Sequence, residues 1–163
     1  MKTMKQLLDT YPRQGEIIWI GLRPERRAPM LSVDKAEATT ESGLLNDRYS
    51  GRSGDRHVTL IQAEHLPVIA SCVGLPLVTP DQLRRNLVVA GLNLLSLKNR
   101  SITIGSVELE ITGLCHPCSR MEQIFGEGGY NAVRGHGGIT ARVTASGIIA
   151  VGDAVSIVPL EHD

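Results

Sequence analysis

Short, β-branched segments separated by glycine-rich turns recur along almost the whole chain, and they constrain the fold more than any other feature. In residues 107–112, Val107, Leu109 and Ile111 alternate with polar residues, which is the period of a strand with one buried face. The segments neither alternate with long helices nor fall into two groups. They therefore predict a mainly β fold with short peripheral helices, a barrel or strongly bent sheet. The predicted strands are residues 15–22, 57–61, 87–90, 101–105, 107–112, 139–144 and 154–159.

Three or four short helices are expected at the periphery of this sheet. Thr79 is suited to cap a helix that has Pro80 at its first position. Residues 62–73 have helical spacing, and Cys72 within them is expected to be a small core hydrophobe. Residues 32–39 alternate without a cleanly apolar face, which predicts an edge strand at best. The other helical segments are residues 119–125 and 130–134.

Length and composition limit the class of protein. A chain of 163 residues fits one domain, and we expect a short helix or frayed lead-in over residues 1–14 followed by the domain over 15–163. The 17 basic and 17 acidic residues balance, and only 3% of residues are aromatic, so we expect no nucleic-acid partner. No signal peptide or membrane-spanning run is visible. Three cysteines make no disulfide framework, so we expect a cytoplasmic protein without a membrane partner.

The stretch Leu114-Cys115-His116-Pro117-Cys118-Ser119-Arg120 carries the most reactive chemistry of the chain. It lies between a predicted strand and a predicted helix, where a helix dipole and nearby cations favour the thiolate form of a cysteine. Four interpretations are open. The pair is half of a zinc site, a thiol–disulfide motif, two packed cysteines, or one thiolate that binds a soft metal or attacks a sulfur-bearing group.

Arginines gather in the loops and at the ends of the predicted elements. Guanidinium groups match phosphate oxygens in geometry and charge, so a cluster of them would suit a phosphorylated organic cofactor. The loop Gly135-His136-Gly137-Gly138 is either a flexible connector or a phosphate-binding loop, and His136 is a candidate ligand or proton carrier. The arginines in question are Arg23, Arg26, Arg27, Arg48, Arg84, Arg85, Arg120 and Arg134.

Several short motifs, in their order and spacing, resemble the MOSC domain, which is named for the C-terminal part of molybdenum-cofactor sulfurases. The resemblance extends over roughly Gly15 to Pro159. This chain has Arg85 where the redox members tend to have proline, and it has a second cysteine, Cys115. The motifs are Gly43 to Arg48, Arg84 to Val89 followed by Gly91, Ile104-Gly105, Pro117-Cys118, Gly138 to Val143 and Gly152 to Val155.

The resemblance implies a β-barrel and a molybdopterin-type molybdenum cofactor, or a sulfur-transfer role on that cofactor. Cys118 matches the family's single cysteine, the proposed molybdenum or sulfur ligand and the candidate catalytic residue. Arg84 and Asn86 match an Arg-x-Asn pair near the pterin, and Arg48 matches an arginine that faces the pterin phosphate. The remaining cofactor-binding candidates are Arg26, Arg27 and His116.

The resemblance leaves the activity open. It implies reduction of N-hydroxylated substrates through a Cys-ligated molybdenum, or the handling of sulfur. The expected partners are a small-molecule cofactor or substrate and an electron-transfer or sulfur-donor protein. Two alternatives remain: a non-catalytic carrier of sulfur or cofactor, and a thiol–disulfide protein that uses Cys115 and Cys118.

Overall fold

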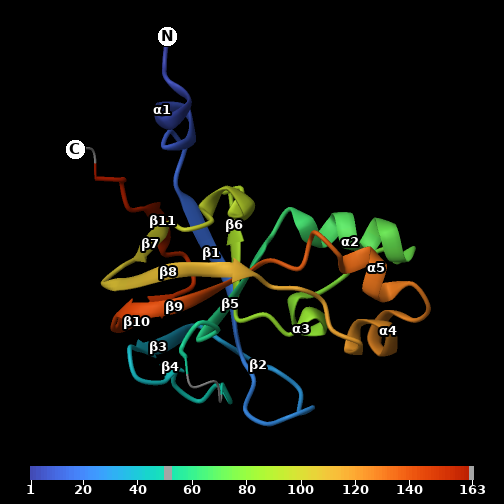
Figure 1. Cartoon of the computed structure of the whole chain (residues 1–163). Coiled ribbons are helices and arrows are strands. Elements are labelled where there is room, and N and C mark those ends of the chain that lie inside the picture. Colours follow the sequence, from blue (N-terminus) through green and yellow to red (C-terminus); the bar gives the residue numbers. More distant parts are fainter. Residues whose placement is uncertain (50–52, 162–163) are drawn as a thin grey trace.

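The computed structural model describes residues 1–49 and 53–161 as a closed β-barrel with short helices on one side (Figure 1). Seven strands form the ring in the order β1, β11, β7, β8, β9, β5 and β6, and β6 pairs again with β1. The β5–β6 pair is parallel and its neighbours are antiparallel. The predicted fold class, a single mainly β domain, is therefore confirmed. The ring strands are β1 (Gly15–Leu22), β5 (Val58–Gln62), β6 (Leu87–Ala90), β7 (Ser101–Ile104), β8 (Val107–Leu114), β9 (Ile139–Ala145) and β11 (Ala154–Ile157).

Four further strands and the helices are attached to this ring. β2 pairs with the end of β1, and a separate three-stranded sheet has the order β10, β3 and β4. The additional strands are β2 (Leu31–Val33), β3 (Lys35–Thr39), β4 (Gly43–Leu44) and β10 (Gly147–Ala150). The helices are α1 (Met4–Leu8), α2 (His65–Val73), α3 (Pro80–Leu83), α4 (Arg120–Phe125), α5 (Gly129–Val133) and the 3-10 turn η1 (Leu94–Leu97).

Alternation along β5 and β6 explains why the helices cover one side of the barrel. Leu60 and Leu87 point into the barrel and join its core. Their neighbours Ile61 and Val88 point outward and pack with buried residues of the helical layer. Since successive strand side chains face opposite sides of a sheet, these two strands are buried on both faces. The helical layer supplies Ile69, Ala70, Val78, Leu83, Met121 and Val133 to this second core.

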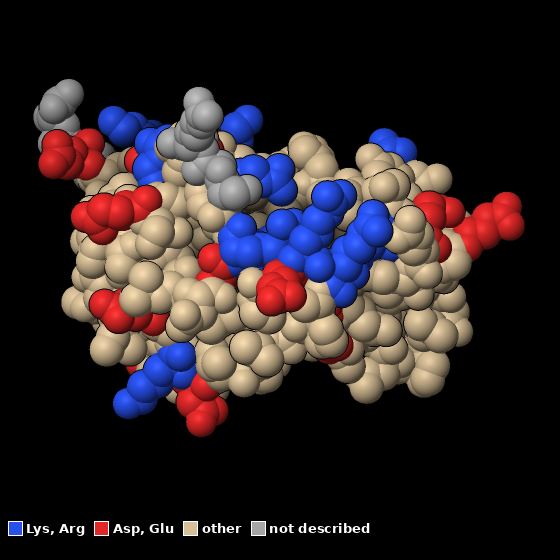
Figure 2. Space-filling view, turned by 90° about the horizontal axis from the view of Figure 1, so that it is seen from below, with Lys and Arg blue, Asp and Glu red and all other residues tan. Residues whose placement is uncertain are grey.

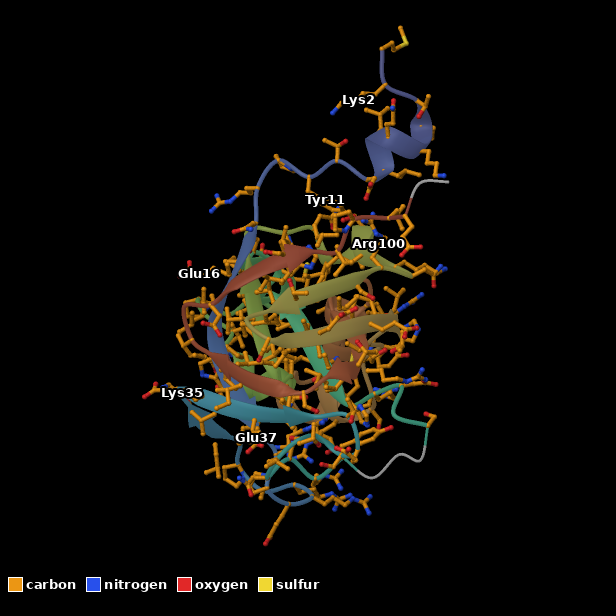
Figure 3. The ribbon with its side chains drawn as sticks, turned by 90° about the vertical axis from the view of Figure 1, so that its left-hand side faces the viewer. Lys2, Tyr11, Glu16, Lys35, Glu37 and Arg100 are labelled. Atoms are coloured by element: carbon orange, nitrogen blue, oxygen red, sulfur yellow. The ribbon has the colours of Figure 1, made fainter. Side chains whose placement is uncertain are left out.

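The lead-in stands out from the barrel. Helix α1 has no buried residue, and Figures 1 and 3 show it projecting beyond the barrel end. Tyr11 ends this projection: its hydroxyl donates to the Ser96 carbonyl at 3.0 Å, and the Arg100 guanidinium lies 5.6 Å from its ring centre. Among the described residues, no helix has the length and apolar character needed to cross a membrane.

Two local predictions were wrong, and one strand was missed. The edge strand over residues 32–39 is two strands, β2 and β3; β3 is the central strand of its sheet because it pairs with β10 on one side and β4 on the other, and its Ala36 and Ala38 are buried. Cys72 is exposed, since α2 buries Ile69 and Ala70 on another face. Strand β10 was not predicted. Its sequence Gly-Ile-Ile-Ala is too short to give a clear pattern, and its pairing with β3 is a long-range contact.

Candidate functional site

Asp47 and Asn86 tie together the loops that carry the candidate arginines. The Asp47 carboxylate accepts hydrogen bonds from the Arg23 backbone N–H at 2.8 Å and from its Nε and Nη2 at 3.1 and 2.8 Å. The same carboxylate accepts from Asn86 Nδ2 at 3.2 Å. The Asp47 side chain is fully buried, so the bidentate Arg23 pair stabilises its charge. Sequence reasoning missed Asp47, because its role depends on partners far away in the chain.

Asn86 is fully buried, and its side chain is engaged by the protein itself. Its Oδ1 accepts from the backbone N–H and the hydroxyl of Thr59, at 3.0 and 3.1 Å. Its Nδ2 donates to the Gly21 carbonyl at 3.0 Å as well as to Asp47. These four bonds join β1, β5 and the Asp47 loop, so the structure places Asn86 beneath the site as a support.

We expect Asn86→Ala to lower the free energy of unfolding by about 2–4 kcal/mol, because it strands several buried polar groups at once. Asn93, which is exposed, offers a matched control, and Asn93→Ala should stay within about 0.5 kcal/mol of wild type. Urea unfolding followed by circular dichroism measures both values. A cost below about 1 kcal/mol for Asn86→Ala would contradict the assigned support role.

Four arginines from separate segments of the chain gather on one face of the molecule. Burial lowers the pKa of Arg84, and the positive charges of Arg120, Arg23 and Arg48 lower it further, while Asp47 opposes them. Such mutual effects require these side chains to lie near one another. Figure 2 shows basic side chains side by side in the middle of this face, which carries β2, α3 and α4 in Figure 1. We call Arg23, Arg48, Arg84 and Arg120 the arginine cluster.

Local geometry fixes the position of Arg84 in the cluster. Thr79 caps α3, Pro80 occupies its first turn as predicted, and Arg84 ends the helix with a left-handed φ of 56°. Its Nη1 donates to the Ala28 carbonyl at 2.7 Å, which holds the loop after β1 against α3. That loop carries Arg26 and Arg27, both exposed, and Arg27 has a φ of 63°. Among the described residues, no hydrogen bond or ion pair joins Arg26 or Arg27 to the cluster, so their cofactor-binding role stays a prediction.

Arg85 and the two cysteines form the inner part of the site. Arg85 is only 7% exposed, with its Nε donating to the Gly137 carbonyl and its Nη1 to the Leu83 carbonyl, both at 2.7 Å. Burial lowers the pKa of Arg85. The charges of Cys115 and Cys118 oppose that effect, while Arg23 and Arg56 add to it. The guanidinium is therefore the link between the arginine cluster and the cysteine loop. Arg85 was among the loop arginines expected to suit a phosphorylated cofactor, whereas Arg56 was not predicted.

The cysteine loop exposes one thiol and buries the other. Cys118 is exposed, and its carbonyl accepts from the Met121 N–H at the start of α4. Cys115 is 3% exposed, and its N–H donates to the Gly138 carbonyl at 2.9 Å. His116 is exposed and lines a mostly apolar pocket of about 430 Å³ with Lys98, Leu95 and Leu114 among its neighbours. Within the described residues, no three His, Cys, Asp or Glu side chains form a group that could hold a metal ion.

The other histidines that the structure describes, His57, His65 and His136, contact neighbouring protein groups. His57 is buried, and its Nδ1 accepts from the Val143 N–H at 3.2 Å. The rings of His65 and His136 meet edge to face with centroids 5.2 Å apart. Burial lowers the pKa of His57. Burial and the charge of His136 lower the pKa of His65, and Glu64 opposes this.

These lowered pKa values predict acid sensitivity. A histidine whose pKa lies below 6.5 in the folded state binds fewer protons there than in the unfolded chain. The free energy of unfolding should therefore fall as the pH drops through 6.5 and through the lower folded-state values. His65→Gln should make this fall less steep. Urea unfolding at a series of pH values measures how steeply the free energy of unfolding falls in the wild type and in the variant. An equally steep fall in His65→Gln would contradict the lowered pKa assigned to His65.

Comparison with known proteins connects this geometry to one family. The family model described as the MOSC domain matches residues 23–156. No curated protein matches the chain at a significant level. The structure is similar to the YUAD protein from Bacillus subtilis, with a TM-score of 0.79 and 18% identity over 91% of this chain and 98% of that one. It is also similar to YiiM from Escherichia coli, with a TM-score of 0.70 and 19% identity over 93% and 73%.

Proposed function

This chain belongs to the MOSC domain family, a molybdenum-cofactor-associated domain, and from that premise we propose that it binds a molybdopterin-type molybdenum cofactor through Cys118 and the arginine cluster. The observation that carries the proposal is the gathering of Arg23, Arg48, Arg84 and Arg120 from four separate segments of the chain. The reaction of the bound cofactor would be the reduction of N-hydroxylated substrates or the handling of its sulfur.

The residues present fit such a group. The carboxylate that acts on Arg84 is that of Asp47. It already accepts hydrogen bonds from Arg23 and Asn86. The cluster therefore carries an excess of positive charge, which an anion with a phosphate group would neutralise. Arginine forks bind phosphate in a bidentate manner, and a cysteine sulfur is a soft ligand for a transition metal.

Each group then has a distinct role. A bound molybdenum centre would supply two-electron oxo-transfer chemistry. Arg84 and Arg48 would hold the phosphate of the cofactor, and the exposed Cys118 sulfur would be the protein's ligand to the metal. Asp47 and Asn86 would keep the loops in place without contacting the cofactor. An electron-transfer or sulfur-donor protein would approach the exposed face that carries Cys118, and the free thiols suit a reducing cytoplasm.

One observation favours a second function, that of a sulfur carrier. Both Cys115 and Cys118 act on the same buried guanidinium of Arg85. A cation placed beside two thiols favours an anionic sulfur, which is the form that accepts and transfers sulfane sulfur. In this function Cys118 would carry the sulfur as a persulfide, and metal would not be needed.

Arg84→Gln tests the phosphate-binding role. In protein purified from a host that makes the cofactor, we expect this change to lower pterin and molybdenum content about 10-fold, because a charge-assisted phosphate contact is lost. The exposed Arg134, whose Nη1 donates to Asn131, offers a matched control, and Arg134→Gln should keep the wild-type content. Metal analysis and fluorescence of the oxidised pterin measure both. Equal losses in the two variants would contradict a specific role for the cluster.

A further inference from the structure

Cys115 is buried, and two guanidinium groups lie near its loop. Its Sγ accepts a weak hydrogen bond from Arg56 Nη2 at 3.8 Å. The backbone of the same loop is fixed by the bond from the Cys115 N–H to the Gly138 carbonyl. A Cβ at Gly137 would meet both the Cys115 carbonyl oxygen, at 2.4 Å, and Arg85 Nη2, at 3.3 Å, so the Arg85 guanidinium lies close to the backbone of the cysteine loop. Cys115 thus has Arg56 and Arg85 as neighbours.

In the part of the chain that the structure describes, one nitrogen of the Arg85 guanidinium, Nη2, has no hydrogen-bond partner near the cysteine loop. Two of its three nitrogens donate to carbonyls, while Nη2 is buried with no hydrogen-bond partner among the described residues. A buried charge without a partner is costly, so such a group is normally matched by an anion. Both cysteines oppose the lowering of the Arg85 pKa by burial, Cys115 more than Cys118. A negative charge that develops on a sulfur of this loop would therefore have the Arg85 guanidinium nearby.

The two thiols differ in access. Cys118 is exposed and can meet a sulfur donor from solvent, whereas Cys115 is 3% exposed and cannot. Cys115 instead lines a small cavity of about 20 Å³ together with His116, Pro117 and the glycines at 135, 137 and 138. A cavity of that size holds about one small molecule such as water. The loop around the inner thiol thus has room for a small molecule and not for a cofactor.

We propose that Cys115 is a second sulfur nucleophile of this site, which releases the sulfur carried by Cys118 as hydrosulfide. The proposal rests on the sulfur-carrying form of the proposed function. In the step, the Cys115 thiolate attacks the inner sulfur of the Cys118 persulfide. A Cys115–Cys118 disulfide forms, the bond between the two persulfide sulfurs breaks, and HS⁻ leaves with the electron pair. A dithiol reductant then restores both thiols by exchange.

The arginines position this step. Arg56, whose Nη2 donates to the Cys115 sulfur, and the buried Arg85 near the same loop would stabilise the negative charge of the attacking sulfur. The two cysteines are three residues apart, and Pro117 between them limits the conformations of the loop. Without Cys115, the persulfide on Cys118 would have no second thiol on its own loop.

Polysulfide loading of the whole protein tests the proposal. All variants carry Cys72→Ser, because Cys72 is exposed and would also react. After polysulfide is removed, the parent protein should release about one equivalent of hydrosulfide and lose the mass of two hydrogens. Cys115→Ser should instead keep one extra sulfur on Cys118, with release at least about 10-fold slower. Hydrosulfide is trapped with a bimane reagent, and intact and peptide masses locate the sulfur.

A second variant covers the case that Cys115→Ser fails to fold. Arg56 is exposed, so Arg56→Gln should fold normally, and it should slow hydrosulfide release about 3- to 10-fold because one cation beside Cys115 is lost. Arg134→Gln serves as the control and should release at the parent rate. Release at the parent rate in Cys115→Ser or in Arg56→Gln would overturn the proposal.

The outcomes also distinguish this release step from the sulfur-carrying function on which it depends. A persulfide that forms on Cys118 and is equally stable with and without Cys115 overturns the release step alone. Absence of any persulfide on Cys118 in the Cys115→Ser protein overturns the carrier function and the release step together. A disulfide between Cys115 and Cys118 that appears together with hydrosulfide supports both.

Discussion

Serine in place of Cys118 is expected to remove molybdenum from the protein almost completely. The hydroxyl is a poorer ligand for a transition metal than a thiolate, and no other exposed sulfur of the cysteine loop can replace it, because Cys115 is buried. We expect metal content to fall more than about 10-fold while the free energy of unfolding changes by less than about 0.5 kcal/mol, as for other exposed positions. Metal analysis and urea unfolding of the same preparations measure both quantities.

Cys72→Ser is the matched control for this change. Cys72 is also an exposed free thiol, but it lies on α2, away from the cysteine loop in the sequence. The Cys72→Ser substitution should leave molybdenum and pterin content at the wild-type level. Metal loss in both variants would mean that metal binding is non-specific, and retention in Cys118→Ser would exclude Cys118 as the ligand.

Alanine in place of Gly138 is expected to destabilise the barrel more than any other single change considered for this chain. Gly138 has a φ of +94°, and a Cβ there would lie 1.9 Å from the Leu60 carbonyl oxygen. That oxygen belongs to β5, so the strand itself would have to move. Combining a disfavoured backbone conformation with overlap of two backbones should cost about 4 kcal/mol or more.

Gly135 allows the cost of the backbone conformation to be measured separately from the cost of the overlap with Leu60. Its φ is +82°, but a Cβ at this position would meet nothing within 4 Å. Gly135→Ala should therefore cost only the backbone strain, about 1–2 kcal/mol. Urea unfolding of the two variants gives the difference. Equal costs would contradict the close approach of Gly138 to Leu60. Because Gly138 O also accepts from the Cys115 N–H, we expect Gly138→Ala to disturb the cysteine loop as well.

The strands of the ring could be predicted because their patterns are local. Val107, Leu109 and Ile111 alternate with polar residues, and all three are buried in β8. The Thr79-Pro80 start of α3 was confirmed for the same reason. The closure of the ring between β1 and β11 could not be predicted, because it joins residues about 140 positions apart, as in the pairing of Gly15 with Val155.

The candidate site was predictable in part. Residue types and order pointed to Cys118, Arg48 and Arg84, and the structure brings Arg48 and Arg84 together. Asn86 was predicted to bind the cofactor, but burial and four internal hydrogen bonds give it a supporting position that no sequence pattern distinguishes. Arg85 was named only as one of several arginines that would suit an anion, and Arg56 was missed, because an arginine next to a strand is usually a solvated residue. Only the fold shows that Arg85 is buried beside two thiols.

The content of molybdenum and pterin in the wild-type protein is the most direct test of the central claim. The protein is produced in a host that makes the cofactor and purified without chelators, and metal, pterin and protein are quantified in the same sample. We predict close to one molybdenum and one pterin per chain, both lost at high salt as the arginine contacts are screened. Protein that contains neither, even after reconstitution with the isolated cofactor, would contradict the claim.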